Sequence, residues 1–177
     1  MTWVLPLILI LLALGCGESI SPGPANRRET ERARQPGRRL AQAFQSRLRG
    51  ELIRALEAGG PSAARQICAA APATAREIGR DARPRAVIRR VTRTPLGLEG
   101  APDPFERLAL EHFEQERGLR GRLPEEWVQR LERAGERRLR YYQPLAAATP
   151  CLGCHGGAPG ALLGLLSVEF SARDLMD

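Results

Sequence analysis

Lysine is absent from this sequence: all 27 basic residues are arginine, and with 20 acidic residues they give a formal net charge of +7. We attribute the missing lysine to genomic base composition, so its absence excludes no class of function. A basic balance favours acidic partners, anionic lipid or nucleic acid. The chain carries no nucleic-acid-binding motif, and we expect no nucleic-acid partner.

Long apolar runs are also scarce, and the run Val4–Leu14 is too short for a standard membrane span. Residues 1–15 carry no charged side chain and lead into Ala13-Leu14-Gly15-Cys16, which resembles a bacterial lipobox. We therefore predict a lipoprotein signal peptide over 1–15, lipidation of Cys16, and a lipid-anchored protein on the periplasmic side of a bacterial membrane. The alternatives are an ordinary cleaved signal peptide, which gives a soluble periplasmic protein, and an uncleaved anchor.

Cysteine and histidine are few, with four Cys and two His in the chain. A structural zinc site needs about four ligands, and no second C-x-x-C or His pair is present. What is present is Cys151-Leu152-Gly153-Cys154-His155, the C-x-x-C-H pattern of c-type haem attachment. In this pattern both thiols form thioethers with the porphyrin, and the histidine is the proximal iron ligand. We predict one covalent haem c on Cys151 and Cys154, with His155 on the iron.

The other axial iron ligand must come from a short set of side chains. Met176 lies next to the end of the chain, where chains fray. Two residues remain, Cys68 and His112, and from the chemistry alone they are about equally suited. Each also has an ordinary structural interpretation: Cys68 as a small buried thiol, and His112 as a core histidine on the apolar face of its helix.

Apolar periodicity and glycine and proline breaks predict an α+β domain over residues 38–177. Residues 16–37 are rich in Ser, Pro, Gly and Arg, and we expect them to form a flexible tether. The predicted helices cover residues 38–58, 61–71 with a break or restart at Pro72 and a continuation to about residue 79, 104–117 with Asp103 as the cap, and 124–134. The predicted strands cover residues 85–92, 138–147 and 162–170.

Sequence blocks spread over about residues 40–172 resemble a bacterial family of single-haem c-type domains with a PAS-like fold. The blocks are Ala64-x-x-Ile67-Cys68-x-x-x-Ala71-Pro72-x-x-Ala75, Arg89-x-Val91-x-x-x-Pro95, Ala101-Pro102-Asp103-x-Phe105-Glu106, Arg140-Tyr141-Tyr142-x-Pro144-Leu145, Cys151-Leu152-x-Cys154-His155-Gly156 and Gly164-x-x-Ser167-Val168. The resemblance implies an antiparallel sheet flanked by helices and a cysteine ligand at the Cys68 position. It therefore favours Cys68 over His112 as the distal ligand. The family's usual Trp before Glu106 is Phe105 here.

A six-coordinate haem has no vacant position for a substrate, so it suits electron transfer. We predict an exported mono-haem cytochrome that exchanges electrons with a redox partner protein. The alternative is a haem-based redox or gas sensor that acts through a partner. We do not expect an enzyme, since a peroxidase needs an open distal site with an acid–base group. Arg89, Arg93 and Arg140 are candidates for pairing with haem propionates.

Overall fold

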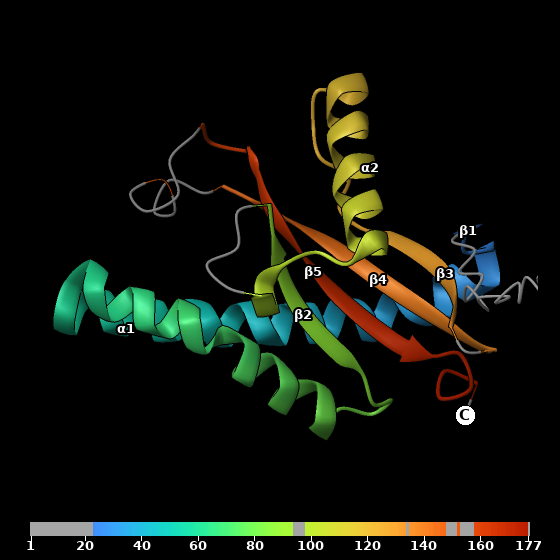
Figure 1. Cartoon of the computed structure of the whole chain (residues 1–177), viewed down its shortest axis with the longest axis horizontal. Helices are drawn as coiled ribbons and strands as arrows, with labels where there is room; N and C mark the ends of the chain where they lie inside the picture. The colour runs from blue at the N-terminus through green and yellow to red at the C-terminus, as the bar shows by residue number, and fades with distance from the viewer. Residues whose placement is uncertain (1–22, 94–97, 134, 148–151, 153–157, 177) are drawn as a thin grey trace, which may run out of the picture.

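The computed structural model describes residues 23–93, 98–133, 135–147, 152 and 158–176. These residues form an α+β fold in which a long helix and a short helix cover a five-stranded antiparallel sheet, with strand order β1-β3-β4-β5-β2 (Figure 1). In chain order the elements are β1 (Gly23–Pro24), α1 (Arg27–Asp81), β2 (Val87–Thr92), the 3₁₀ turn η1 (Leu98–Gly100), α2 (Pro104–Arg120), β3 (Trp127–Arg133), β4 (Glu136–Ala146) and β5 (Leu162–Ser171).

Helix α1 starts well before the predicted residue 38. Asn26 caps it: the Asn26 side chain accepts from the Glu29 N–H at 3.0 Å, and Glu29 accepts from the Asn26 N–H at 2.9 Å. Ala33 is fully buried, and a Cβ on Gly37 would collide with the ring of Tyr141. The tether predicted for residues 16–37 is therefore wrong from Arg27 onward, because small residues let this turn of helix pack closely on the sheet.

Helix α1 doubles back at Gly60, which adopts a φ of 63° that glycine tolerates without a Cβ penalty. We call residues 27–59 the first leg and residues 61–81 the second leg. The turn between the legs projects beyond the sheet (Figure 1). The break at Gly59–Pro61 is thus confirmed, whereas the break predicted at Pro72 is wrong, because the second leg continues through Pro72 to Asp81.

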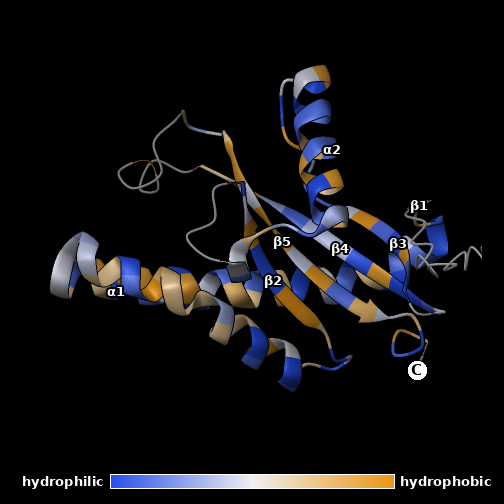
Figure 2. Cartoon of the chain, in the orientation of Figure 1, coloured by the Kyte–Doolittle hydropathy of each residue, from blue (hydrophilic) through white to orange (hydrophobic). Residues whose placement is uncertain are grey.

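The two faces of the sheet bury two separate cores, and each helix covers one of them. Alternation along β5 places Leu166, Val168 and Phe170 against α1, while Leu165 packs in a second cluster with Val91 and with Ala109 of α2. Figure 2 shows apolar residues along the strands. Successive side chains of a strand point to opposite faces of the sheet. Because both faces are covered, the odd or even position of a residue along its strand, which we call its parity, decides which helix it contacts.

The segment predicted as a helix over 124–134 is strand β3, so that prediction is wrong. Its burial alternates: Leu131 is buried whereas Arg130 and Glu132 are exposed, and it pairs with β4 in register from Trp127↔Tyr142 to Arg133↔Glu136. Trp127, Val128 and Leu131 suit a helical face as well as a strand, so pairing with β4 decides between them.

Helix α2 and the remaining strands are confirmed close to their predicted bounds. Asp103 caps α2 by accepting from the Glu106 N–H at 2.8 Å, Glu106 returns the bond, and Pro104 is the first helical residue. The helix ends at Gly121, which has a φ of 70°. Strands β2, β4 and β5 lie where the sequence patterns predict them.

Candidate functional site

The C-x-x-C-H motif lies in the connection between β4 and β5, neighbouring strands inside the sheet. Cys151, Cys154 and His155 lie outside the described residues, as does Cys16. The base of this connection is closed: the Ala147 N–H donates to the Ala161 carbonyl at 2.8 Å, and the Gly160 N–H donates to the Ala147 carbonyl at 2.9 Å. The chain segment that carries the motif therefore leaves and re-enters the sheet at one point.

Cys68 lies on the second leg of α1, in a stripe of small residues that faces inward. The stripe repeats at helical spacing through Ala64, Cys68, Ala71, Ala75 and Gly79. The other four members are buried, with Ala64 at 5% exposure and Ala71 at 1%, whereas Cys68 is only half-buried and its thiol is free. The described residues thus leave an inward-facing thiol partly uncovered.

Pro72 shapes the backbone at Cys68. A proline inside a helix lacks the N–H that would bond the carbonyl four residues earlier, and its ring presses against that carbonyl. The carbonyl four residues before Pro72 belongs to Cys68. Pro72 thus frees the Cys68 carbonyl from the helical ladder.

The donor set and the exposed apolar residues near the turn of α1 fit a haem. A thiolate and an imidazole are both established axial ligands of haem iron. The turn end of α1 also exposes Ile53 at 49% and Leu56 at 42%, an apolar surface of the kind that a porphyrin covers. Figure 1 shows this turn and the ends of β4 and β5 that flank the connection on the same side of the molecule.

His112 lies on α2, across the sheet from Cys68. Its ring stacks on Trp127 with centroids 4.5 Å apart and meets Phe113 edge-on at 5.7 Å. Trp127 stacks in turn on Tyr142 at 5.6 Å. Burial lowers the pKa of the His112 imidazole below its ordinary value. His112 is thus half-buried in an aromatic stack, and the sheet separates it from Cys68.

A buried ionic cluster occupies the α2 side of the sheet. Arg140 is 4% exposed; it bonds Asp103 at 2.7 Å and makes a short ion pair with Glu169. Glu106 is fully buried, with its Oε1 3.1 Å from Arg89 Nε. Two of the three arginines considered for propionate binding, Arg89 and Arg140, are therefore already paired with carboxylates.

The electrostatics of this cluster depend on Arg140. Burial raises the pKa of the Asp103 carboxyl, but the charge of Arg140 and the Glu106 N–H outweigh it, so that the Asp103 pKa lies below its ordinary value. Burial raises the pKa of the Glu106 carboxyl. Burial also disfavours the charged form of Arg140, yet its anionic surroundings hold the Arg140 pKa above the ordinary value.

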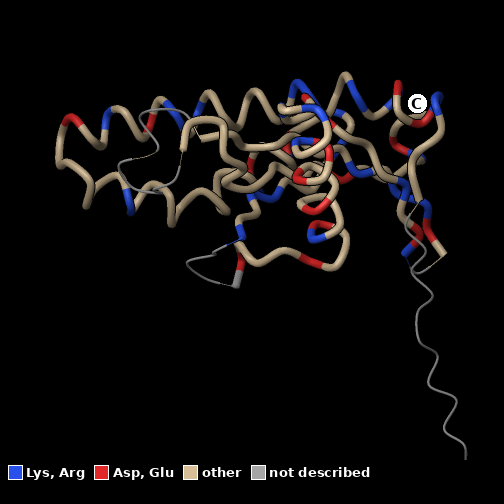
Figure 3. Tube along the Cα trace, turned by 90° about the horizontal axis from the view of Figure 1, so that it is seen from above, with Lys and Arg blue, Asp and Glu red and all other residues tan. Residues whose placement is uncertain are grey.

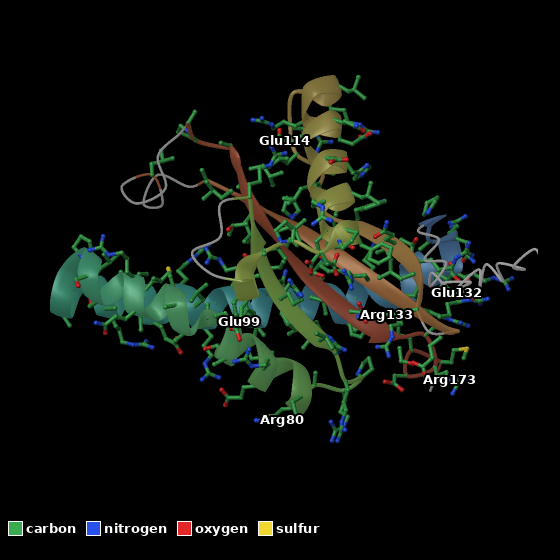
Figure 4. All side chains as sticks on the ribbon, in the orientation of Figure 1. Arg80, Glu99, Glu114, Glu132, Arg133 and Arg173 are labelled. Carbon is green, nitrogen blue, oxygen red and sulfur yellow. The ribbon has the colours of Figure 1, made fainter. Side chains whose placement is uncertain are left out.

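Arg93, the third arginine considered, is half exposed, and its Nη2 lies 3.6 Å from Oε1 of Glu114. Figure 4 labels Glu114 on α2. A groove of about 350 Å³ opens beside the buried cluster, lined by Arg89, Arg138, Arg140, Asp103 and Glu169 among others. Its charged walls do not suit an apolar ring. Basic positions elsewhere are spread along both legs of α1 and the sheet rather than gathered in one patch (Figure 3).

The aromatic stack and the ionic cluster were not predicted from the sequence. The stack depends on β3, which the sequence analysis assigned to a helix. The cluster was detectable in part, because strand alternation places Arg89, Arg140 and Glu169 on one face.

Among the described residues, no group of three His, Cys, Asp or Glu side chains is placed to hold a metal ion. No helix in the described part of the chain is long and apolar enough to cross a membrane.

The sheet and the haem motif together define a class, the single-haem c-type cytochrome domains. Within that class the chain belongs to the Tll0287-like family, whose family model, Tll0287, matches residues 25–164. The match includes Cys68 and the C-x-x-C-H motif, and membership indicates a haem-binding domain. No curated protein and no solved structure matched the chain in the corresponding searches.

Proposed function

We propose that this protein is an exported, lipid-anchored PAS-like cytochrome that transfers electrons through one covalent haem c. Cys151 and Cys154 hold the porphyrin, His155 binds the iron from one side, and Cys68 binds it from the other. The observation that carries the proposal is the environment of Cys68: a half-buried thiol within an otherwise buried stripe of α1. The turn of this helix lies on the same side of the molecule as the ends of β4 and β5 (Figure 1).

The haem supplies a one-electron Fe(III)/Fe(II) couple, and the protein residues set its potential. Thiolate ligation donates electron density and favours the ferric state relative to Met/His ligation. With both axial positions filled by side chains, no position remains for a substrate, which favours a carrier over an enzyme. The protein exchanges electrons with a redox partner, and lipid on Cys16 holds it on the periplasmic side of the membrane.

The test uses the full chain, exported in a bacterial host that matures c-type cytochromes. Haem staining after denaturing electrophoresis reports covalent attachment, and radiolabelled fatty acid in Cys16→Ser and wild type reports lipidation. Electron paramagnetic resonance of the ferric form in wild type, Cys68→Ala and His112→Ala reports the distal ligand. We expect a low-spin thiolate spectrum that is lost only in Cys68→Ala.

Two results would contradict parts of this proposal. A high-spin ferric spectrum that neither substitution changes would refute Cys68 ligation and leave an open iron position. Rapid binding of CO by the reduced wild type, with release of the thiolate, would favour the sensor function over the carrier, because Cys68 would then be exchangeable.

A further inference from the structure

The adjacent residues Arg89 and Arg90 of β2 point to opposite faces of the sheet. Arg89 shares the parity of Val91, which packs in the α2-side core, and it joins the ionic cluster there. Arg90 shares the parity of Ile88, which packs in the α1-side core. Arg90 therefore lies on the same face of the sheet as α1 and Cys68.

A second polar residue lies level with Arg90 on this face. Leu166 of β5 pairs with Arg90 on one side and with Gln143 of β4 on the other. Gln143 has the parity of Tyr141 in the α1-side core, and its Oε1 is buried with no hydrogen-bond partner among the described residues. The Oε1 atom is an acceptor, so a carboxylate does not satisfy it, but the Nε2–H groups of the same amide are donors that a carboxylate can accept from.

The row lies close to the motif-bearing connection. Gly164, two residues before Leu166, pairs with both Thr92 and Leu145, and the next pair is Ala146↔Leu162 at the base of the connection. Leu166 lies four residues from Leu162, a span of roughly 13 Å along the strand, which is comparable with the width of a porphyrin.

Arg90 is half-buried and has no carboxylate partner among the described residues. On α1, the helix packed on this side of β2, Glu77 pairs with Arg47 at 3.1 Å and Arg76 pairs with Glu99 of η1 at 3.1 Å, so both carboxylates already have arginine partners. A half-buried guanidinium that lacks an anion suits a carboxylate ligand, which it binds in a bidentate manner.

We propose that Arg90, with Gln143 beside it, binds a haem propionate. This inference rests on the proposed function, since it requires the covalent haem. It replaces Arg89 and Arg140 as propionate partners, because those side chains lie on the other face. Arg90 neutralises the propionate and thereby keeps its negative charge from stabilising the ferric iron.

The test is a redox titration of the haem-loaded full chain between pH 4.5 and pH 9, in wild type, Arg90→Gln, Arg90→Lys, Gln143→Leu and Arg93→Gln. In Arg90→Gln the propionate charge is left uncompensated, so we expect the redox equilibrium at pH 7 to move about tenfold toward the ferric form, or ~59 mV for one electron. The difference should close at low pH as the propionate protonates. Gln143→Leu should shift the equilibrium in the same direction by less.

Arg93→Gln is the matched control, because it removes the same charge three residues away from a side chain paired with Glu114. It should leave the potential unchanged, and equal shifts in Arg93→Gln and Arg90→Gln would overturn the inference. Arg90→Lys keeps the charge but loses the bidentate contact, so a smaller shift is expected. If Arg90→Gln does not assemble, Arg90→Met takes its place, and a wild-type potential in that variant would refute the proposal. Haem bound by every variant with unchanged potentials would refute the propionate site alone, whereas absence of covalent haem from the wild type would refute the function as well.

Discussion

Replacing Arg140 by methionine tests whether the ionic cluster is essential to the fold. The side chain is 4% exposed and contacts Asp103, Glu169 and, at 3.9 Å, Glu106. Methionine keeps most of the volume and removes the charge. The perturbation therefore leaves buried carboxylates without their central cation.

The expected loss is about 3 kcal/mol of unfolding free energy at pH 7. Removing one partner of a buried ion pair costs roughly 3–5 kcal/mol. The lower end applies here, because Glu169 keeps Arg138 at 3.3 Å and Glu106 keeps Arg89 at 3.1 Å. Arg138→Met is the matched control: its side chain is 30% exposed, so its loss should be about 1 kcal/mol or less.

The pH dependence gives the prediction a second readout. Without Arg140, burial raises the pKa of the remaining carboxyls in the folded state above their unfolded values. The folded variant then binds protons more tightly than the unfolded chain, so its stability rises as the pH falls. In the wild type the pKa of Asp103 is lowered, so that contribution is lost as the pH falls. The gap between the two proteins should narrow from pH 7 to pH 5.

The assay is urea unfolding followed by circular dichroism at both pH values. Adding Glu169→Gln to Arg140→Met should recover part of the loss, because one unpaired charge is then removed. Equal stabilities for Arg140→Met and Arg138→Met, or a gap that does not change with pH, would refute the reasoning.

Two further substitutions test the packing on each face of the sheet. Gly37→Ala forces a Cβ into the ring of Tyr141, and the free energy of unfolding measured in urea should fall by about 1–3 kcal/mol. The control is Gly118→Ala, where a Cβ would meet no atom within 4 Å, and it should be neutral or stabilise by up to ~1 kcal/mol. Equal effects of the two substitutions would contradict the close packing of α1. Burial lowers the pKa of His112, so the wild type should lose stability as the pH falls below about 6.5. His112→Gln should flatten that part of a melting-temperature profile between pH 5 and pH 8, and parallel profiles would show that the His112 pKa is not lowered.

Helix ends could be predicted from the sequence where a single residue, such as a cap, a proline or a glycine, determines the local backbone conformation. The Asp103 cap, Pro104 and the Gly59–Pro61 break predicted the start of α2 and the turn of α1. The start of α1 could not be predicted in this way. Residues 27–37 have little apolar surface of their own, and they pack because Ala33 and Gly37 fit against the sheet.

The iron ligands stay a prediction from the sequence, whereas the arrangement of the other candidate residues comes from the structure. Cys68 and His112 were equivalent as donors until the sheet separated them. Arg89 and Arg140 were reasonable partners for a carboxylate, but the parity of β2 and β4 turns them toward α2. The face on which a strand residue lies depends on register, which no single segment determines.

The closed base of the connection between β4 and β5 bears on how the mature cytochrome is assembled. Every ladder pair of these strands, from Arg138↔Ser171 to Ala146↔Leu162, forms outside the segment that carries the two thiols. The members of the two cores in the described part of the chain likewise lie outside that segment. Attachment of the proposed haem would therefore require none of these strand pairs to open, so the sheet could form before the cofactor is attached.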